Sequence, residues 1–195
     1  MTRTLKLADG GPRDASRIVP VIRRQAPRSD DVIVLAPEFR PISENLVGEL
    51  LVMYAFDLPG HFEYASGHSC SILGLDPESL RKLSVRNLTR LRSKPEILRP
   101  SGAVNMLRLD GDLEASLLLV DHLWPQIASA IAGEVVVGVP SRDVLAVSGT
   151  GVTGGIEMLR RAVERAWKRA HNPKLMLTPS LLVRRADSWQ VFDRV

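Results

Sequence analysis

The apolar residues of this chain occur in short runs that proline and glycine interrupt, and this pattern limits the fold to short, turn-connected elements. The 195 residues include 13 prolines and 14 glycines. Residues 17–24 and 32–36 are rich in β-branched side chains and bounded by proline, aspartate or serine, as strands are. The longest apolar stretches, residues 50–56 and 117–120, fall far short of the roughly 20 residues that span a bilayer. The sequence therefore predicts a globular protein without a membrane-spanning helix.

Strand and helix signals follow one another along the chain in an order that predicts an α+β fold with a mostly antiparallel sheet. Turn sequences separate the apolar runs, because proline presets φ and glycine permits a positive φ. The expected hairpins cover residues 46–66, 96–109, 134–147 and 181–192, and the expected helices cover residues 76–92, 110–132 and 156–170. We expect residues 1–16 to form a flexible tail and residues 17–195 to form a single domain with about three α-helices.

Charged residues are arranged in five blocks of alternating sign, which the formal net charge of +4 conceals. The blocks carry net charges of +5, −7, +6, −6 and +6 over residues 1–28, 29–77, 78–108, 109–157 and 158–195. Such blocks can neutralise one another across the fold or present separate faces to partners. One predicted partner surface consists of basic residues on two expected helices: Lys82, Arg86, Arg90, Arg161, Arg165 and Lys168. Because the chain has only nine aromatic residues, mostly within apolar runs, nucleic-acid binding is a secondary hypothesis.

The sequence contains neither a recognisable secretory signal nor a pair of cysteines, and these two observations predict the cellular compartment. Residues 1–16 contain no continuous apolar stretch of the kind that a secretory signal requires. The single cysteine, Cys70, cannot form an internal disulfide, so nothing favours an oxidising compartment. We therefore expect a cytoplasmic protein.

Seven segments of the chain resemble a known bacterial pattern. They are residues 18–23 (IVPVIR), 54–57 (YAFD), 62–64 (FEY), 86–88 (RNL), 110–116 (DGDLEAS), 121–124 (DHLW) and 138–145 (GVPSRDVL). In order and spacing they resemble the YtpQ-like bacterial proteins, a family of unknown function, over about residues 17–193. The resemblance implies an intracellular bacterial setting but no reaction and no catalytic residue. Members of that family are generally longer at the N-terminus, so the resemblance covers only their C-terminal body.

A glycine-rich segment is the first candidate site. Residues 149–155 (GTGVTGG) follow a predicted strand and precede a predicted helix, as loops that bind phosphate do. Gly149, Gly151 and Gly154 satisfy the pattern G-x-G-x-x-G, and Arg142 could supply a further anion contact. The segment lies near the C-terminal end, however, and the acidic residue expected roughly 20 residues later to bind a ribose is missing. A nucleotide or phosphate site is therefore an alternative, and we favour a connecting loop.

The turn Pro140-Ser141-Arg142-Asp143 is the second candidate site. It places a serine nucleophile, an anion clamp and an orienting carboxylate between two predicted strands. A serine nucleophile needs a base within reach, and the sequence places none of the four histidines beside Ser141. We favour a hairpin turn in which Asp143 bonds to nearby backbone and pairs with Arg142.

An acidic cluster raises the question of a metal site. It consists of Asp110, Asp112, Glu114, Asp121 and His122. The sequence Asp110-Gly111-Asp112 is also a good helix start, because acidic side chains are stabilised at the positive end of the helix dipole. We favour helix capping and predict no metal site. Cys70 is expected to be a small buried hydrophobic residue.

These observations favour a binding role over catalysis, although the sequence does not decide whether the protein is an enzyme. The main hypothesis is a non-enzymatic cytoplasmic protein that binds another protein, such as an adaptor or an immunity-type protein. The first alternative is a nucleotide or phosphate-ligand protein or enzyme using the glycine-rich segment, and the second is a nucleic-acid binder. We predict no cofactor.

Overall fold

The computed structural model describes residues 13–25, 35–92, 94–99, 102–169 and 172–193. Most of the predicted strand at residues 32–36 and the first twelve residues of the predicted tail lie outside this part of the chain. Within the described residues, no helix is long and apolar enough to cross a membrane. The first element of the described residues is a short 3-10 helix, η1 (Ala15–Arg17), which contacts α2 (Leu80–Leu91).

The first half of the chain forms a four-stranded antiparallel sheet. Its strands are β1 (Ile18–Arg24), β2 (Ser43–Val47), β3 (Leu50–Leu58) and β4 (His61–Tyr64). Strand β3 is central: it pairs with β1 along one edge and with both β2 and β4 along the other. The predicted turn at Pro59 and Gly60 is confirmed, because Leu58 pairs with His61. Helix α2 packs against β1, and the short helix α1 (Gly67–Ile72) follows β4.

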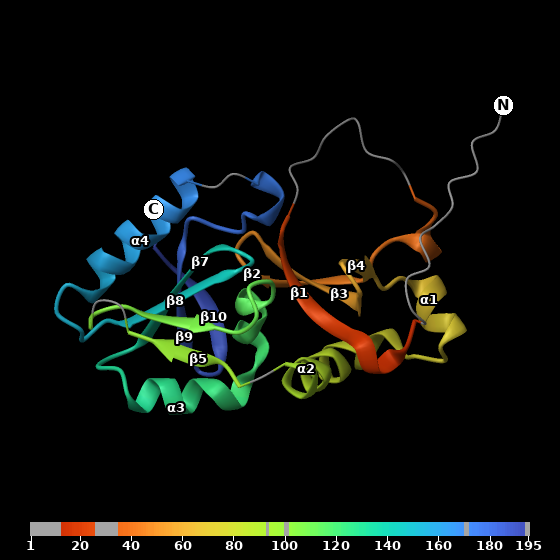
Figure 1. The fold of residues 1–195 in the computed structure, drawn as a ribbon, viewed down its shortest axis with the longest axis horizontal. Helices are drawn as coiled ribbons and strands as arrows, with labels where there is room; N and C mark the ends of the chain where they lie inside the picture. Colours follow the sequence, from red (N-terminus) through yellow and green to blue (C-terminus); the bar gives the residue numbers. More distant parts are fainter. Residues whose placement is uncertain (1–12, 26–34, 93, 100–101, 170–171, 194–195) are drawn as a thin grey trace.

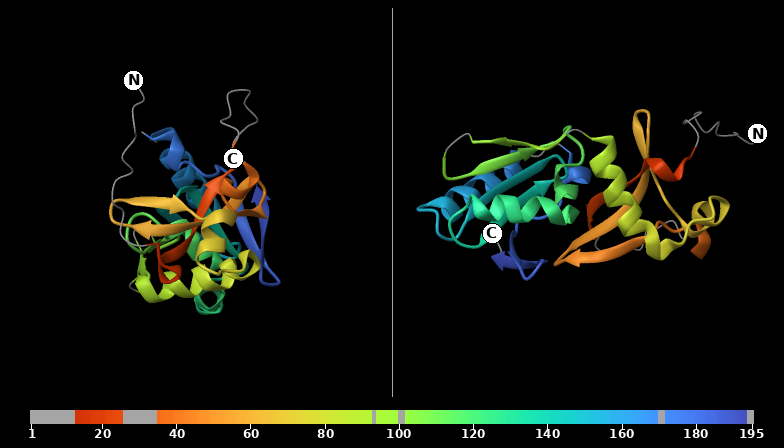
Figure 2. Two further views of the ribbon diagram at one scale, coloured as in Figure 1. Left: turned by 90° about the vertical axis from the view of Figure 1, so that its right-hand side faces the viewer. Right: turned by 90° about the horizontal axis from the view of Figure 1, so that it is seen from below.

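The second half of the chain forms a six-stranded antiparallel sheet in the order β10-β9-β7-β8-β6-β5. Its strands are β5 (Glu96–Leu98), β6 (Asn105–Arg108), β7 (Val135–Ser141), β8 (Val144–Gly149), β9 (Leu181–Arg185) and β10 (Ser188–Asp193). Helix α4 (Gly155–Arg169) packs against β7 and β8, and α3 (Trp124–Ser129) lies on the other side of the sheet (Figure 1). The α+β class is confirmed, with two sheets that lie one beyond the other along the molecule (Figure 2).

Between the two sheets lies a 3-10 helix, η4 (Glu114–Leu119), of which all six residues are buried. It contacts β1 of one sheet and β8 of the other. Two tryptophan indoles, packed edge to face at 4.7 Å, bind its backbone: Trp124 Nε1 donates to the Leu117 carbonyl at 3.0 Å, and Trp189 Nε1 to the Leu118 carbonyl at 2.9 Å. One hydrophobic cluster consequently includes buried residues of both sheets, and a second, smaller cluster lies between α4 and the second sheet.

The structure corrects the predicted helix over residues 110–132. It contains two 3-10 helices, η4 and η5 (Asp121–Leu123), followed by the six-residue α3, which ends at Ser129. An amphipathic α-helix needs a solvent face, whereas η4 is enclosed by protein on all sides, and 3-10 geometry is common in such short connecting segments.

The predicted capping role of Asp110 and Asp112 is also wrong. Leu113 occupies the N-cap position of η4 and makes no side-chain cap bond. The buried carboxylate of Glu114 anchors the segment instead: its Oε1 accepts bonds from the amides of Leu109 at 3.0 Å and Gly111 at 2.7 Å. Asp110 and Asp112 are then available to pair with arginines from other parts of the fold.

Ion pairs join blocks of opposite charge across the fold. They include Arg24–Glu49, Arg92–Asp57, Arg92–Asp110, Arg184–Asp121 and Arg185–Glu134, at 2.6–3.1 Å. The bond from Arg185 lowers the pKa of the exposed Glu134 carboxyl below its usual value. Of the two arrangements that the sequence allowed, mutual neutralisation therefore accounts for much of the charge alternation.

Substituting Leu118→Ala should destabilise the protein by about 2–5 kcal/mol, because it opens a cavity at the contact between the sheets. Leu118 is 1% exposed, whereas Leu91, at the end of α2, is 38% exposed. The matched control Leu91→Ala should change stability by less than about 0.5 kcal/mol. Urea unfolding of both variants measures the difference, and equal midpoints would contradict the central role of η4.

Candidate functional site

A polar cleft of about 470 Å³ lies where the two sheets meet. Its walls come from β1, the β3–β4 hairpin, the residue after α2, the loop before η4 and the β7–β8 turn. The lining residues are Arg23, Asp57, Leu58, Gly60, His61, Phe62, Arg92, Asp112 and Arg142. We call this site the arginine cleft, because three guanidinium groups from distant parts of the chain converge on it.

Two of the arginines lie on aromatic rings of the same strand. Phe62 and Tyr64 are two residues apart in β4, so their side chains point to the same face. The guanidinium carbon of Arg142 lies 5.3 Å from the centre of the Phe62 ring, and that of Arg23 lies 5.5 Å from the centre of the Tyr64 ring. Cation–π contacts of this kind fix the plane of a guanidinium while leaving its edge free to donate.

The backbone around Arg142 is held from both directions. Its amide donates to the Leu175 carbonyl at 3.0 Å, and its carbonyl accepts from the Ala115 amide at 3.1 Å. Its side chain is 13% exposed and reaches Asp112, whose Oδ1 lies 2.6 Å from Nη2. Nε of Arg142 is buried without a hydrogen-bond partner. The site therefore holds a rigidly placed guanidinium with unused donors.

Arg92 has a different environment from Arg142. Its Nη2 donates to Asp57 Oδ2 at 2.6 Å, and its Nε lies 2.7 Å from Asp110 Oδ2. All three side chains are about three-quarters buried. Arg92 thus joins the β3–β4 hairpin to the loop before η4, and its charge is neutralised by two carboxylates.

The charge in the cleft is divided unevenly. Arg23 donates to the Tyr64 hydroxyl and to the Lys174 carbonyl, and no carboxylate among the described residues is within ion-pair distance of it. Arg142 has one carboxylate partner, Asp112, which is 56% exposed. The side of the cleft formed by Arg23 and Arg142 therefore carries an excess of positive charge, and the side formed by Arg92 an excess of negative charge.

The candidate turn at residues 140–143 contributes one residue to the cleft. Arg142 lines it, whereas Ser141 and Asp143 do not. Ser141 belongs to β7 and pairs with Val144, which leaves Arg142 and Asp143 as the two turn residues. The hairpin that we favoured is present, but Arg142 pairs with Asp112 and not with Asp143 as expected.

The glycine-rich segment packs tightly against the loop that follows α3. Gly151 donates from its amide to the Ala132 carbonyl at 2.9 Å, and Thr150 exchanges backbone and side-chain bonds with Glu134. The amides of Val152 and Gly155 also donate within the segment. A Cβ added to Gly149 would overlap the Ala132 carbonyl. Close backbone packing therefore explains the glycine at position 149. Four of the seven backbone amides of residues 149–155 already donate hydrogen bonds within the protein and are not free to bind an anion.

The basic residues of the predicted partner surface lie on two separate helices. Lys82, Arg86 and Arg90 are on α2, which covers β1, whereas Arg161, Arg165 and Lys168 are on α4, which covers β7 and β8. The two helices lie in different halves of the molecule (Figure 1). The fold therefore presents two smaller basic surfaces.

The acidic cluster is dispersed among other partners. Asp110 and Asp112 pair with arginines, Glu114 binds backbone amides, and Asp121 pairs with Arg184 at 3.1 Å. In the part of the chain that the structure describes, no group of three His, Cys, Asp or Glu side chains is placed to hold a metal ion. Cys70 is buried, and burial raises the pKa of its thiol.

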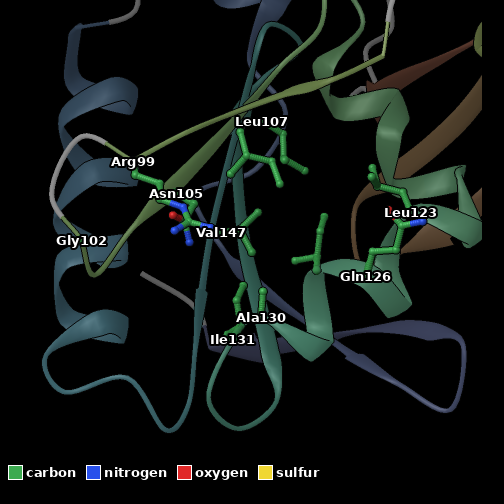
Figure 3. Close-up of a pocket in the computed structure, with 11 residues that line it drawn as sticks. Arg99, Gly102, Asn105, Leu107, Leu123, Gln126, Ala130, Ile131 and Val147 are labelled. Atoms are coloured by element: carbon green, nitrogen blue, oxygen red, sulfur yellow. The ribbon is translucent and has the colours of Figure 1, made fainter.

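A smaller hollow of about 170 Å³ lies between α3 and strands β5, β6 and β8 (Figure 3). Leu107 and Val147 line it from the sheet, and Leu123 faces them from the start of α3. Arg99 and Asn105 lie together at one end. Its walls are mostly aliphatic and its polar groups few, so it defines a ligand less well than the arginine cleft does.

Comparison with known proteins gives a distant bacterial relative. The chain is similar to a UPF0354 protein of Listeria innocua, with 28% identity over 123 residues, which are 60% of this chain and 45% of the relative. The match thus spans less than half of the relative's length. No protein-family model matches the chain. No solved structure matches it significantly. The similarity supports a relationship to an uncharacterised bacterial family, and it does not test the more specific YtpQ-like resemblance.

Sequence reasoning found one member of the cleft as a ligand contact and missed its neighbours. The alternation of Phe62 and Tyr64 and the short β1 run were visible, but nothing local indicates that Arg23 and Arg142 stack on these rings. The pairs are 41 and 80 residues apart in sequence. The pairing of β1 and β4 with β3 brings Arg23 to Tyr64, and the contact of the β7–β8 turn with the first sheet brings Arg142 to Phe62.

Substituting Gly149→Ala should destabilise the protein by about 3 kcal/mol, because the methyl group would displace the backbone at Ala132. The matched control is Gly67→Ala at the start of α1, where the new Cβ would meet its nearest atom, the Glu38 carbonyl oxygen, at 3.5 Å. This control should leave stability within about 0.5 kcal/mol of the parent. Thermal unfolding measures both, and a harmless Gly149→Ala substitution would remove the packing explanation.

Proposed function

We propose that this protein is a cytoplasmic bacterial binding module, of the YtpQ-like type, that recognises an acidic group of a protein partner in the arginine cleft. The observation on which this proposal rests is the pair of guanidinium groups of Arg142 and Arg23, which lie over the rings of Phe62 and Tyr64 respectively. An adaptor or immunity-type role, as expected from the sequence, is compatible with such a site.

The spacing of the two stacks suits a small oxyanion. Side chains two residues apart on a strand are roughly 7 Å apart. A carboxylate or phosphate placed between the two guanidinium groups could accept bonds from both, and bonds of this charge-assisted kind are about twice as strong as neutral ones. Arg142 would donate from the terminal nitrogens of its guanidinium, since Nη2 already reaches the exposed Asp112 and Nε is buried. Binding would also displace the exposed carboxylate of Asp112 from Arg142.

The composition of the cleft favours a protein partner. Arginine and aromatic residues are enriched at the energetically important positions of protein–protein interfaces. Five of the segments that resemble YtpQ-like proteins contribute to the cleft, through Arg23, Asp57, Phe62, Asp112 and Arg142. The same chemistry would accept a phosphate, so the source of the anion has to be decided by experiment.

The substitution Arg142→Gln should weaken binding of an anion at least tenfold, because it removes the charge and the bidentate edge. The substitution Asp112→Asn should have the opposite effect and strengthen binding several-fold, since it removes the competing carboxylate. The matched control Arg86→Gln removes the same charge from an exposed position of α2, away from the cleft, and should change nothing. The measurement is a chemical-shift titration with inorganic phosphate, with citrate and with a glutamate-rich peptide.

The three probes distinguish the sources of the anion. Tightest binding of the peptide supports a protein partner, and binding of phosphate alone identifies a phosphate ligand in its place. If none of the probes binds, or if Arg142→Gln and Arg86→Gln weaken binding equally, the arginine cleft is not a recognition site. Circular dichroism of each variant establishes that the fold is retained.

A further inference from the structure

Helix α4 covers only part of one face of the six-stranded sheet. A row of paired residues crosses this face from β9 to β5 in the order Leu181, Gly138, Ala146, Met106 and Leu98. The first members lie under α4, where a Cβ at Gly138 would overlap Val163. Exposure rises along the row from 0% at Leu181 and 4% at Ala146 to 41% at Leu98. At Met106 and Leu98 the β6–β5 side of this face is therefore apolar and open, and the paired residues Glu96 and Arg108 lie next to them on the same face.

A groove of about 480 Å³ runs between the open part of the sheet and the side of α4. Its floor includes Val104, Met106 and Ala146, which belong to or adjoin strands β6 and β8. Its wall includes Met158, Ala162 and Ala166, which are four residues apart and so lie on one side of α4. The groove thus has a floor formed by the sheet and a wall formed by α4, and both are mainly apolar.

The width of the open surface matches that of one further helix. Strands are about 4.8 Å apart, so β6 and β5 add about 10 Å to the sheet beyond β8. An α-helix with its side chains is about 10–12 Å across, and neighbouring helices pack 8–10 Å apart. A helix lying beside α4 would therefore complete the layer that α4 begins.

The charges along the groove select among such helices. Arg161 and Arg165 line it from α4 and are both exposed. Arg161 pairs with Glu157 at 2.9 Å, but both side chains are more than half exposed, so this pair contributes little and can be exchanged. Repulsion by Arg161 and Arg165 disfavours a basic segment in the groove. A helix with an apolar stripe flanked by glutamate or aspartate would bury the stripe against the floor of the groove and pair its acidic side chains with Arg161 and Arg165.

We propose that the groove between α4 and the β5–β6 hairpin binds an acidic amphipathic helix of a protein partner. The site is separate from the arginine cleft and does not depend on anion binding there. It assigns a specific role to Arg161 and Arg165, which the sequence identified only as a basic surface.

The probe is a labelled 14-residue helical peptide, roughly 21 Å long, with leucines on one face and flanking glutamates. Fluorescence anisotropy should show saturable binding to the full chain. Ala162→Arg should weaken binding at least tenfold by placing a charged side chain in the groove. Replacing Arg161 and Arg165 together by alanine should weaken it five- to tenfold and reduce its salt dependence. The matched control, Lys82→Ala with Arg86→Ala on α2, removes the same charge and should bind normally.

Two further peptides and two assays make the outcome decisive. A scrambled peptide of the same composition and a version with lysine in place of glutamate should bind at least tenfold more weakly. Equal binding of either peptide, or full binding by Ala162→Arg, would overturn the proposal. Sedimentation showing a dimer that Ala162→Arg dissociates would identify a second copy as the occupant. Binding to phosphatidylglycerol vesicles that Ala162→Arg abolishes would identify a membrane surface as the occupant. Either of these two results would contradict the proposal that the groove binds a helix of a protein partner.

Discussion

The buried carboxylate of Glu114 fixes the segment on which the two halves of the molecule depend. By accepting bonds from the Leu109 and Gly111 amides, it closes the loop before η4 and directs an almost wholly apolar stretch into the space between the sheets. Each sheet needs one buried face, and η4 supplies apolar surface to both. The tryptophan bonds to the Leu117 and Leu118 carbonyls then satisfy backbone groups that burial would otherwise leave unpaired.

The arginine cleft follows from the same arrangement. The amide of Ala115, the second residue of η4, donates to the carbonyl of Arg142, so the segment that joins the sheets also positions the β7–β8 turn. On the other side, Arg92 ties the β3–β4 hairpin to the loop before η4. The aromatic rings of β4 and the arginine of the second sheet therefore approach each other without any direct strand pairing between the sheets. The arginine cleft thus results from the way in which η4 and the loop before it connect the two sheets.

The sequence predicted best those strands, turns and helices that are determined by residues only a few positions apart. The hairpins at residues 58–61 and 185–188 and the α4 helix follow from turn residues and apolar spacing within a few positions. The prediction of a helix over residues 110–132 failed because the conformation of an apolar run depends on what surrounds it. Glu114 belonged to the acidic cluster that we interpreted as helix capping, and only the tertiary structure shows that it binds the preceding loop. The arginine–aromatic contacts depend on partners 41 and 80 residues away, for which one sequence provides no local signal.

The alternating charge blocks explain why many arginines of so basic a chain are held in ion pairs. Most blocks are joined by ion pairs to a block of the opposite sign, which uses guanidinium groups on structural contacts. The two proposed binding surfaces border the same hairpin: Arg142, at the β7–β8 turn, faces the cleft, while Pro140 and Val144, on either side of the turn, line the α4 groove. One rigid hairpin thus separates a polar recognition surface from an apolar one. A partner that contacted both would gain from two weak contacts held in fixed geometry, because the second is made at high effective concentration.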